Sequence, residues 1–243
     1  MKRGAESALQ HQPAAKKPKI NKTLEQLLSE VSNGIFEDFR SHLEDKNITQ
    51  LDLSNNKVAN VNLQNLGQAL QGTQVTHVNL SDNNIGAQGA KDFGESLKDT
   101  KVTHVNLNEN EVGAQGAKDF GESLKNTQVT HVNLSLNAMG DQGAKDFGES
   151  LKGTKIADIN LGSNSISPQG AKDFGESLKH TQVTHVNLNY NTLGNQGAKD
   201  FGEFLKHTQV THVNLRWNEI GDQGVKDFGE ALKTPKSRML TLA

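Results

Sequence analysis

The sequence predicts an α/β solenoid, in which short parallel strands form one layer and helices form a second layer. Three observations predict it. One unit recurs seven times at a spacing of 27 residues, each copy holds a strand-like stretch and then a helix-like stretch, and apolar residues recur in register. A period of this length is typical of a solenoid, because a single unit cannot bury its own apolar faces.

The composition fits a folded protein outside the membrane. The chain has 243 residues, 33% of them hydrophobic and 22% charged, with a formal net charge of −2. It has no cysteine, which excludes disulfides and thiolate chemistry and fits a reducing compartment. No stretch has the roughly 18 apolar residues of a membrane span, and no apolar segment of a secretory signal follows the first residues. We therefore expect an intracellular protein with no membrane partner and no cofactor.

Residues 1–22 are predicted to be a disordered basic tail. Two basic clusters stand in it, Lys2-Arg3 and Lys16-Lys17-Pro18-Lys19, in a pattern that resembles a bipartite nuclear localisation signal. An acidic groove of a nuclear import receptor could bind the two clusters separately. A solubilising tail or a weak contact with nucleic acid are the alternatives. Nucleic acid is disfavoured as the main ligand, because the tail has no interleaved aromatic residues and the rest of the chain is acidic.

Residues 23–47 are predicted to form a helical cap at the N-terminal end. Thr23 and Gln26 have the spacing of a capping box, and apolar residues follow at helical spacing. This first stripe consists of Leu24, Leu27, Leu28 and Val31. Gly34 is expected to end the helix. A second short helix is predicted from Ile35, Phe36, Phe39 and Leu43.

Residues 48–236 are predicted to hold seven repeats. The repeats start at Ile48, Val75, Val102, Val129, Ile156, Val183 and Val210. In the second copy, Val78 and Leu80 alternate with polar residues, which predicts a strand with one buried face. The stripe of one helix face follows, formed by Ala90, Phe93, Gly94 and Leu97. Residues 237–243 are predicted to add a partial repeat strand, which could cap the sheet or leave an edge for another chain.

The first eleven residues of each copy carry a family resemblance. VTHVNLSDNNI and its counterparts resemble the LxxLxLxxNxL signature of leucine-rich repeats, and GAQGAKDFGESLK resembles the helical part of the ribonuclease-inhibitor-like subclass. The resemblance covers residues 48–233. It implies a curved parallel sheet on the concave side, helices on the convex side, and a non-enzymatic role in binding proteins.

Two columns of asparagine recur in register. The resemblance implies that the asparagine at position nine of each repeat turns inward and bonds to backbone groups. This column is Asn56, Asn83, Asn110, Asn137, Asn164, Asn191 and Asn218. The asparagine at position five is expected on the concave face, where neighbouring strands about 4.8 Å apart allow amide-to-amide bonds.

Histidine recurs at position three, also on the predicted concave face. The column is His77, His104, His131, Asp158, His185 and His212. Two histidines flanking one carboxylate could bind a divalent metal, so His131, Asp158 and His185 are candidate ligands. The alternative is that exposed histidines were copied with the repeat and stay mostly neutral at pH 7.

The copies differ mainly at positions seven, eight and ten, where each strand ends. The chain has one Tyr and one Trp, and both stand at position eight, in adjacent copies. Trp, Tyr and Arg are the residue types most enriched at interface hot spots. The predicted partner-binding residues are Tyr190, Trp217, Arg216 and Leu136, with Glu109 and Glu111 beside them. Single exposed aromatic residues are also common on surfaces without a function.

These observations predict a non-enzymatic scaffold that binds a partner protein on its concave face and rim, in the nucleus. Nearly identical copies together with a nuclear signal resemble the repeat effectors that intracellular bacteria send into host cells, which would place the protein in a host nucleus. A small-GTPase regulator is one alternative, because a Ran GTPase activator shares the ribonuclease-inhibitor-like fold. The metal site is the other.

Overall fold

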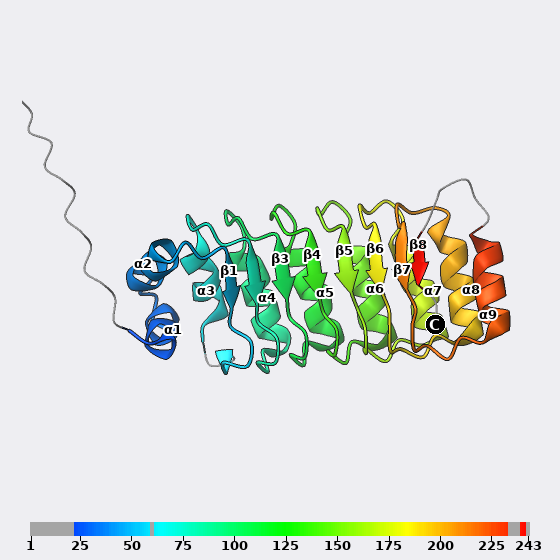
Figure 1. The fold of residues 1–243 in the computed structure, drawn as a ribbon, viewed down its shortest axis with the longest axis horizontal. Coiled ribbons are helices and arrows are strands. Elements are labelled where there is room, and N and C mark those ends of the chain that lie inside the picture. The colour runs from blue at the N-terminus through cyan, green and yellow to red at the C-terminus, as the bar shows by residue number, and fades with distance from the viewer. Residues whose placement is uncertain (1–21, 59–60, 233–238, 242–243) are drawn as a thin grey trace, which may run out of the picture.

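The computed structural model describes residues 22–58, 61–232 and 239–241. Figure 1 shows one row of strands and one row of helices running side by side along the length of the molecule. The predicted nuclear-signal residues lie outside the described residues. They are Lys2, Arg3, Lys16, Lys17 and Lys19.

The strands form one eight-stranded parallel sheet in chain order. They are β1 (Gln50–Asp52), β2 (His77–Asn79), β3 (His104–Asn106), β4 (His131–Asn133), β5 (Asp158–Asn160), β6 (His185–Asn187), β7 (His212–Asn214) and β8 (Met239–Thr241). Each strand residue pairs with its counterpart 27 residues away, so Val78 lies between Leu51 and Val105. Equivalent residues of the repeats therefore form rows across the sheet, and the predicted α/β solenoid of parallel strands and helices is confirmed.

A helix follows each strand from β1 to β7, and these helices cover one face of the sheet (Figure 1). They are α3 (Leu63–Leu70), α4 (Gly86–Ser96), α5 (Gly113–Ser123), α6 (Gly140–Ser150), α7 (Pro168–Ser177), α8 (Gly194–Leu205) and α9 (Asp222–Ala231). Two shorter helices precede the sheet, α1 (Leu24–Ser32) and α2 (Glu37–Asp45). None of the helices in the described part of the chain is long and apolar enough to cross a bilayer.

The core lies between the sheet and the helices. Val78 of β2 and Leu80 just after it, and Ala90 and Phe93 of α4 with Leu97 just after that helix, are almost fully buried. Their counterparts in the other repeats join them in one continuous apolar cluster. In the first copy, whose helix sequence differs, leucines fill the equivalent places at Leu63, Leu66 and Leu70. Burying one such side chain stabilises the fold by roughly 1.5–3 kcal/mol.

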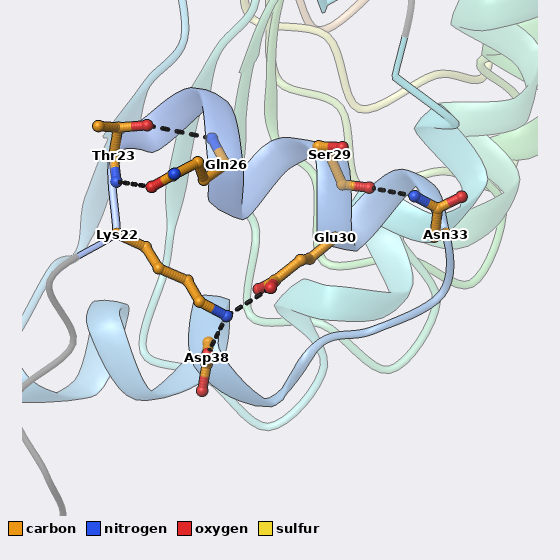
Figure 2. A network of polar contacts seen from close by, with 7 residues as sticks. All are labelled: Lys22, Thr23, Gln26, Ser29, Glu30, Asn33 and Asp38. Atoms are coloured by element: carbon orange, nitrogen blue, oxygen red, sulfur yellow. Dashed lines mark hydrogen bonds and ion pairs between the residues drawn. The ribbon is translucent and has the colours of Figure 1, made fainter.

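The N-terminal cap begins with the predicted capping box. The Thr23 hydroxyl accepts from the Gln26 backbone N–H at 3.2 Å, and the Gln26 side chain accepts from the Thr23 N–H at 2.9 Å (Figure 2). Gly34 has a φ of +80° and follows the end of α1. The second predicted helix is confirmed as α2, but Ile35 and Phe36 lie before its first residue, and Ile35 is 56% exposed, so their predicted place in this helix is wrong.

Lys22 ties the start of the described chain to this cap. Figure 2 shows its ammonium group between Glu30 of α1 and Asp38 of α2, with an ion pair to each carboxylate. The hydrogen bonds that Lys22 donates, first to Asp38 and then to Glu30, raise the pKa of Lys22 above its ordinary value. Although Lys22 falls within the predicted tail, its contacts belong to the helical cap.

The position-nine asparagines hold consecutive repeats together. The Asn137 carboxamide oxygen accepts from the backbone N–H groups of Asn110 at 3.0 Å and Val112 at 3.1 Å. Its Nδ2 donates to the backbone carbonyl of Leu107 at 2.8 Å. These partners all belong to the preceding repeat. Asn56 belongs to the first repeat, so its side chain has no preceding repeat to bond to, and it is exposed. The inward placement predicted for the whole column is therefore wrong for Asn56.

Candidate functional site

The face of the sheet that the helices leave uncovered, here called the open face, is a shallow groove. The groove over β1 to β5 has a volume of about 440 Å³. Its lining includes His77, His104 and His131 at position three and Asn79 and Asn106 at position five. A second groove continues over β6 and β7. The alternation of the strands therefore presents histidine and asparagine to solvent, while the aliphatic residues face the helices.

The histidine rings of neighbouring strands stack on one another. The centroids of the His77 and His104 rings are 3.9 Å apart, those of His104 and His131 also 3.9 Å, and those of His185 and His212 4.0 Å. Burial lowers the pKa of His104, and the neighbouring imidazoles of His131 and then His77 lower it further, against the opposing effect of Asp158. His104 is therefore neutral at pH 7.

Each of these rings is held by the threonine before it. The Nδ1 atom of His104 lies 2.8 Å from the Thr103 hydroxyl, and the Nδ1 atom of His131 lies 2.8 Å from the Thr130 hydroxyl. This contact restrains the orientation of each ring and engages Nδ1, so Nε2 is the second ring nitrogen that can form a hydrogen bond. The open face is thus a regular hydrogen-bonding surface.

The predicted metal ligands are neighbours in the sheet, but they do not form a metal site. Asp158 pairs in register with His131 on one side and His185 on the other. The two histidines are therefore separated by two strand spacings, about 10 Å. Metal–ligand bonds of about 2.0–2.2 Å require ligand atoms within roughly 4 Å of each other. Within the described ranges, no group of three His, Cys, Asp or Glu side chains could hold a metal ion.

The position-five asparagines form part of the expected amide ladder. Asn106 donates from Nδ2 to the Asn79 side-chain oxygen at 2.8 Å, and Asn79 donates to the Asp52 carboxylate at 2.9 Å. The Asn79 oxygen also accepts from the Ser81 backbone N–H at 3.2 Å. These side chains thus stabilise the turn at the end of the strand.

The rim is the row of turns that follows the strands, and it carries the side chains of positions eight and ten. In repeats two to seven, position eight has a φ between +52° and +58°. The residues are Asp82, Glu109, Leu136, Ser163, Tyr190 and Trp217. Asparagine and aspartate tolerate this left-handed conformation best, and bulky side chains adopt it rarely. Leucine, tyrosine and tryptophan therefore occupy rim positions that their backbone preferences disfavour.

Tyr190 and Trp217, here called the aromatic pair, stack on each other on this rim. Their ring centroids are 5.6 Å apart and the ring planes are 6° from parallel. Tyr190 is 55% exposed and Trp217 is 66% exposed. Leu136, two repeats before Tyr190, is 50% exposed. The structure thus places three of the predicted residues together on one surface, with their apolar area in solvent.

The predicted charged residues lie on the same rim. Arg216 is exposed and directly precedes Trp217, and its backbone carbonyl accepts from the Tyr190 N–H at 2.9 Å. Glu109 and Glu111 are also exposed, but they belong to repeat three, while Trp217 belongs to repeat seven. The acidic residues and the aromatic pair are therefore two separate areas of one surface.

Two features of this surface could not be read from the sequence alone. The sequence shows that histidine recurs at position three, but it does not show that the imidazole rings stack on one another. The left-handed backbone at position eight was also missed. Its signal was indirect: Asp82, Ser163 and the Asn55 of the first copy are residue types typical of turns.

The fold and the register define a solenoid of parallel strand–helix repeats. Comparison with protein families matches the description "Leucine Rich repeat" at residues 73–94, 98–121, 125–148, 179–202 and 206–229. These five segments of the chain are therefore leucine-rich repeats. The matched segments leave out most of repeat five, in which Asp158 replaces histidine and Ser167-Pro168 starts the helix.

No curated protein sequence matches the chain. Among solved structures, it is similar to "Leiomodin-1 Actin-Binding Site 2 (ABS2)", with 18% sequence identity and a TM-score of 0.47. The match covers 60% of this chain and 84% of that one.

Proposed function

We propose that the protein is a non-enzymatic interaction scaffold that binds a partner protein on the open face and the rim of its repeats. The single observation that carries the proposal is the aromatic pair, stacked at 5.6 Å and more than half exposed. Leucine-rich repeats, which the family comparison identifies, support a protein partner. We also propose that the repeats belong to the ribonuclease-inhibitor-like subclass, on the basis of the segment GAQGAKDFGES, which forms the 11-residue helices α4 and α5.

The backbone beneath the aromatic pair strengthens this proposal. Tyr190 has a φ of +52° and Trp217 a φ of +58°, a conformation that costs a bulky residue on the order of 1 kcal/mol. In solution, their exposed rings also keep apolar area in contact with water. Within the described chain, the stacking of the two rings is the one packing contact that offsets the backbone strain and the exposure of the rings. A partner that covers both rings would bury this apolar area and so offset both costs. Rigid aromatic side chains of this kind are typical hot spots.

The proposal predicts that the aromatic pair is required for capture of a partner. Tyr190→Asn with Trp217→Asn removes both rings and keeps residue types that tolerate a positive φ. We expect the double variant to recover at least tenfold less of the specific partners from a cell extract, because hot-spot loss costs about 2 kcal/mol or more. Affinity capture with quantitative mass spectrometry measures the difference.

The matched control is Ile35→Ala, which removes an equally exposed apolar side chain from the N-terminal cap. It should retain the partners that the wild-type protein captures. Circular dichroism should show the same helix content for all three proteins. Unchanged recovery by the double variant would remove the aromatic pair from the proposed site.

We further propose that the protein acts in the nucleus through the basic tail, with a nuclear import receptor as a second partner. The two basic clusters support this, and the near identity of the repeats supports an origin among secreted bacterial effectors. Lys16→Ala with Lys17→Ala should lower the nuclear-to-cytoplasmic ratio of a tagged protein at least severalfold. Fluorescence imaging measures this ratio, and an unchanged value would refute the proposed nuclear localisation signal.

A further inference from the structure

We infer that the rim binds one extended peptide segment, with a basic residue over the acidic repeats and an aromatic or proline residue on the aromatic pair. This inference rests on the proposed function, because it names the kind of partner that the same surface takes. It goes further than the proposed function, because it specifies the direction in which the peptide lies along the rim and the spacing between its contact residues.

The chemistry of the rim changes in order along the solenoid. Repeats two and three present carboxylates at positions eight and ten, Asp82, Glu109 and Glu111, and no basic residue at positions seven, eight or ten. Repeat four presents Leu136, and repeat five presents two small serines. Repeats six and seven present the aromatic pair, and repeat seven also presents the exposed Arg216 at position seven and the exposed Glu219 at position ten. At positions seven, eight and ten, one end of the rim thus has three carboxylates and no basic residue, while the other end is aromatic and has one residue of each charge.

The acidic end is available to a ligand. All three carboxylate side chains are exposed, and within the described part of the chain none of them has an ion pair or a side-chain hydrogen bond. Their positive φ values, from +55° to +57°, place them in the same backbone conformation as the aromatic pair. A cationic side chain could therefore approach them without displacing an internal partner.

The distance between the two ends fits an extended peptide. Glu109 and Trp217 are four repeats apart, which is about 19 Å at the spacing of parallel strands. An extended chain advances about 3.3 Å per residue, so about six residues span this distance. Leu136 lies about 10 Å from Tyr190 by the same reasoning, so a third contact falls about three residues from the aromatic end.

The charge favours a basic peptide over a nucleic acid. Nucleic-acid phosphates require cationic contacts, and the carboxylates of repeats two and three would repel them. The aromatic rings would supply most of the affinity, because exposed charge pairs contribute little and act mainly on orientation and association rate. The carboxylates therefore select the direction in which the peptide lies.

A display selection with a random twelve-residue peptide library tests the inference. Wild-type protein is the bait, and Tyr190→Asn/Trp217→Asn protein removes peptides that bind elsewhere. We expect enriched peptides to carry lysine or arginine about six residues from an aromatic residue or proline. The affinity of the best peptide is then measured by fluorescence anisotropy with three proteins: wild type, Glu109→Lys/Glu111→Lys, and Glu95→Lys/Glu122→Lys.

The last variant is the matched control, because it makes the same change of net charge at exposed positions of α4 and α5. We expect the rim variant to bind about fivefold more weakly at low salt, and the control to change by less than twofold. A peptide with glutamate in place of its basic residues should regain affinity for the rim variant.

Two outcomes would overturn the inference. One is that no peptide is enriched, and the other is that affinity does not respond to the rim charges. If the aromatic pair is needed for protein capture but either outcome occurs, the proposed function stands and the extended basic peptide is refuted. If the aromatic pair is not needed for protein capture, the proposed binding site and the inferred peptide are both refuted.

Discussion

Replacing Asn137 with alanine is expected to lower the free energy of unfolding by about 3–5 kcal/mol. Asn137 is 1% exposed and lies in the middle of the position-nine column. Its side chain is the hydrogen-bond partner of the Asn110 N–H, the Val112 N–H and the Leu107 carbonyl. Alanine would leave these three backbone groups buried and unpaired.

The size of the effect follows from counting the groups that lose a partner. A buried donor or acceptor without a partner costs about 1–3 kcal/mol, so three such groups give a lower bound of about 3 kcal/mol, and single substitutions rarely cost more than about 5 kcal/mol. The Ser135 carbonyl also accepts from Asn137, at 2.9 Å, but it keeps a second bond from the Glu109 N–H at 3.0 Å. It is therefore left out of the count.

The matched control is Asn56→Ala, in the same column. Asn56 is exposed, and its Nδ2 donates only to the Ser54 carbonyl, within its own turn. Urea denaturation followed by circular dichroism should show a change within about 0.5 kcal/mol for this variant. Equal losses for the two variants would contradict the proposed role of the column in joining consecutive repeats.

The comparison of these two asparagines shows how far the sequence predicts the fold. The exact period predicted the register, because equal spacing places equal letters side by side on a stacked sheet. It predicted the buried Phe93 and the inward Asn83 in the same way. The sequence could not show that Asn56 differs from Asn83, because the two residues are the same. They differ in that Asn83 has a preceding repeat to bond to and Asn56 does not.

The candidate site was less accessible to sequence reasoning for a physical reason. The position of Tyr190 beside Trp217 follows from the register, and so it was predictable. The parallel stacking of their rings depends on side-chain rotation and on the left-handed backbone at position eight, which no periodicity reports. The failure of His131, Asp158 and His185 as a metal site likewise depends on distances across two strands.

A second stability prediction concerns the contact between neighbouring helices. Gly121→Ala is expected to destabilise the protein by about 1–3 kcal/mol. A Cβ atom at Gly121 would lie 1.9 Å from the Ser150 hydroxyl oxygen and 3.0 Å from the Phe147 ring. Ser150 also donates to the Phe147 carbonyl at 2.5 Å, so its hydroxyl cannot move without losing that bond. Helices α5 and α6 would have to separate.

The last repeat supplies the control for this change. Gly229 occupies the place of Gly121 in α9, and a Cβ atom there would meet no described atom within 4 Å. Gly229→Ala should therefore stabilise the protein by up to about 1 kcal/mol, because alanine favours a helix more than glycine does. Thermal unfolding should show a lower Tm for Gly121→Ala and an unchanged or higher Tm for Gly229→Ala.

A rescue variant identifies the cause of the loss. Ser150→Gly removes the side-chain atoms nearest to the new Cβ, and only the Phe147 contact at 3.0 Å remains. The pair Gly121→Ala/Ser150→Gly should therefore be more stable than the sum of the two single changes predicts, since residues in contact are not additive. If the two changes were additive, the glycine at this position would not be explained by close packing against the next repeat.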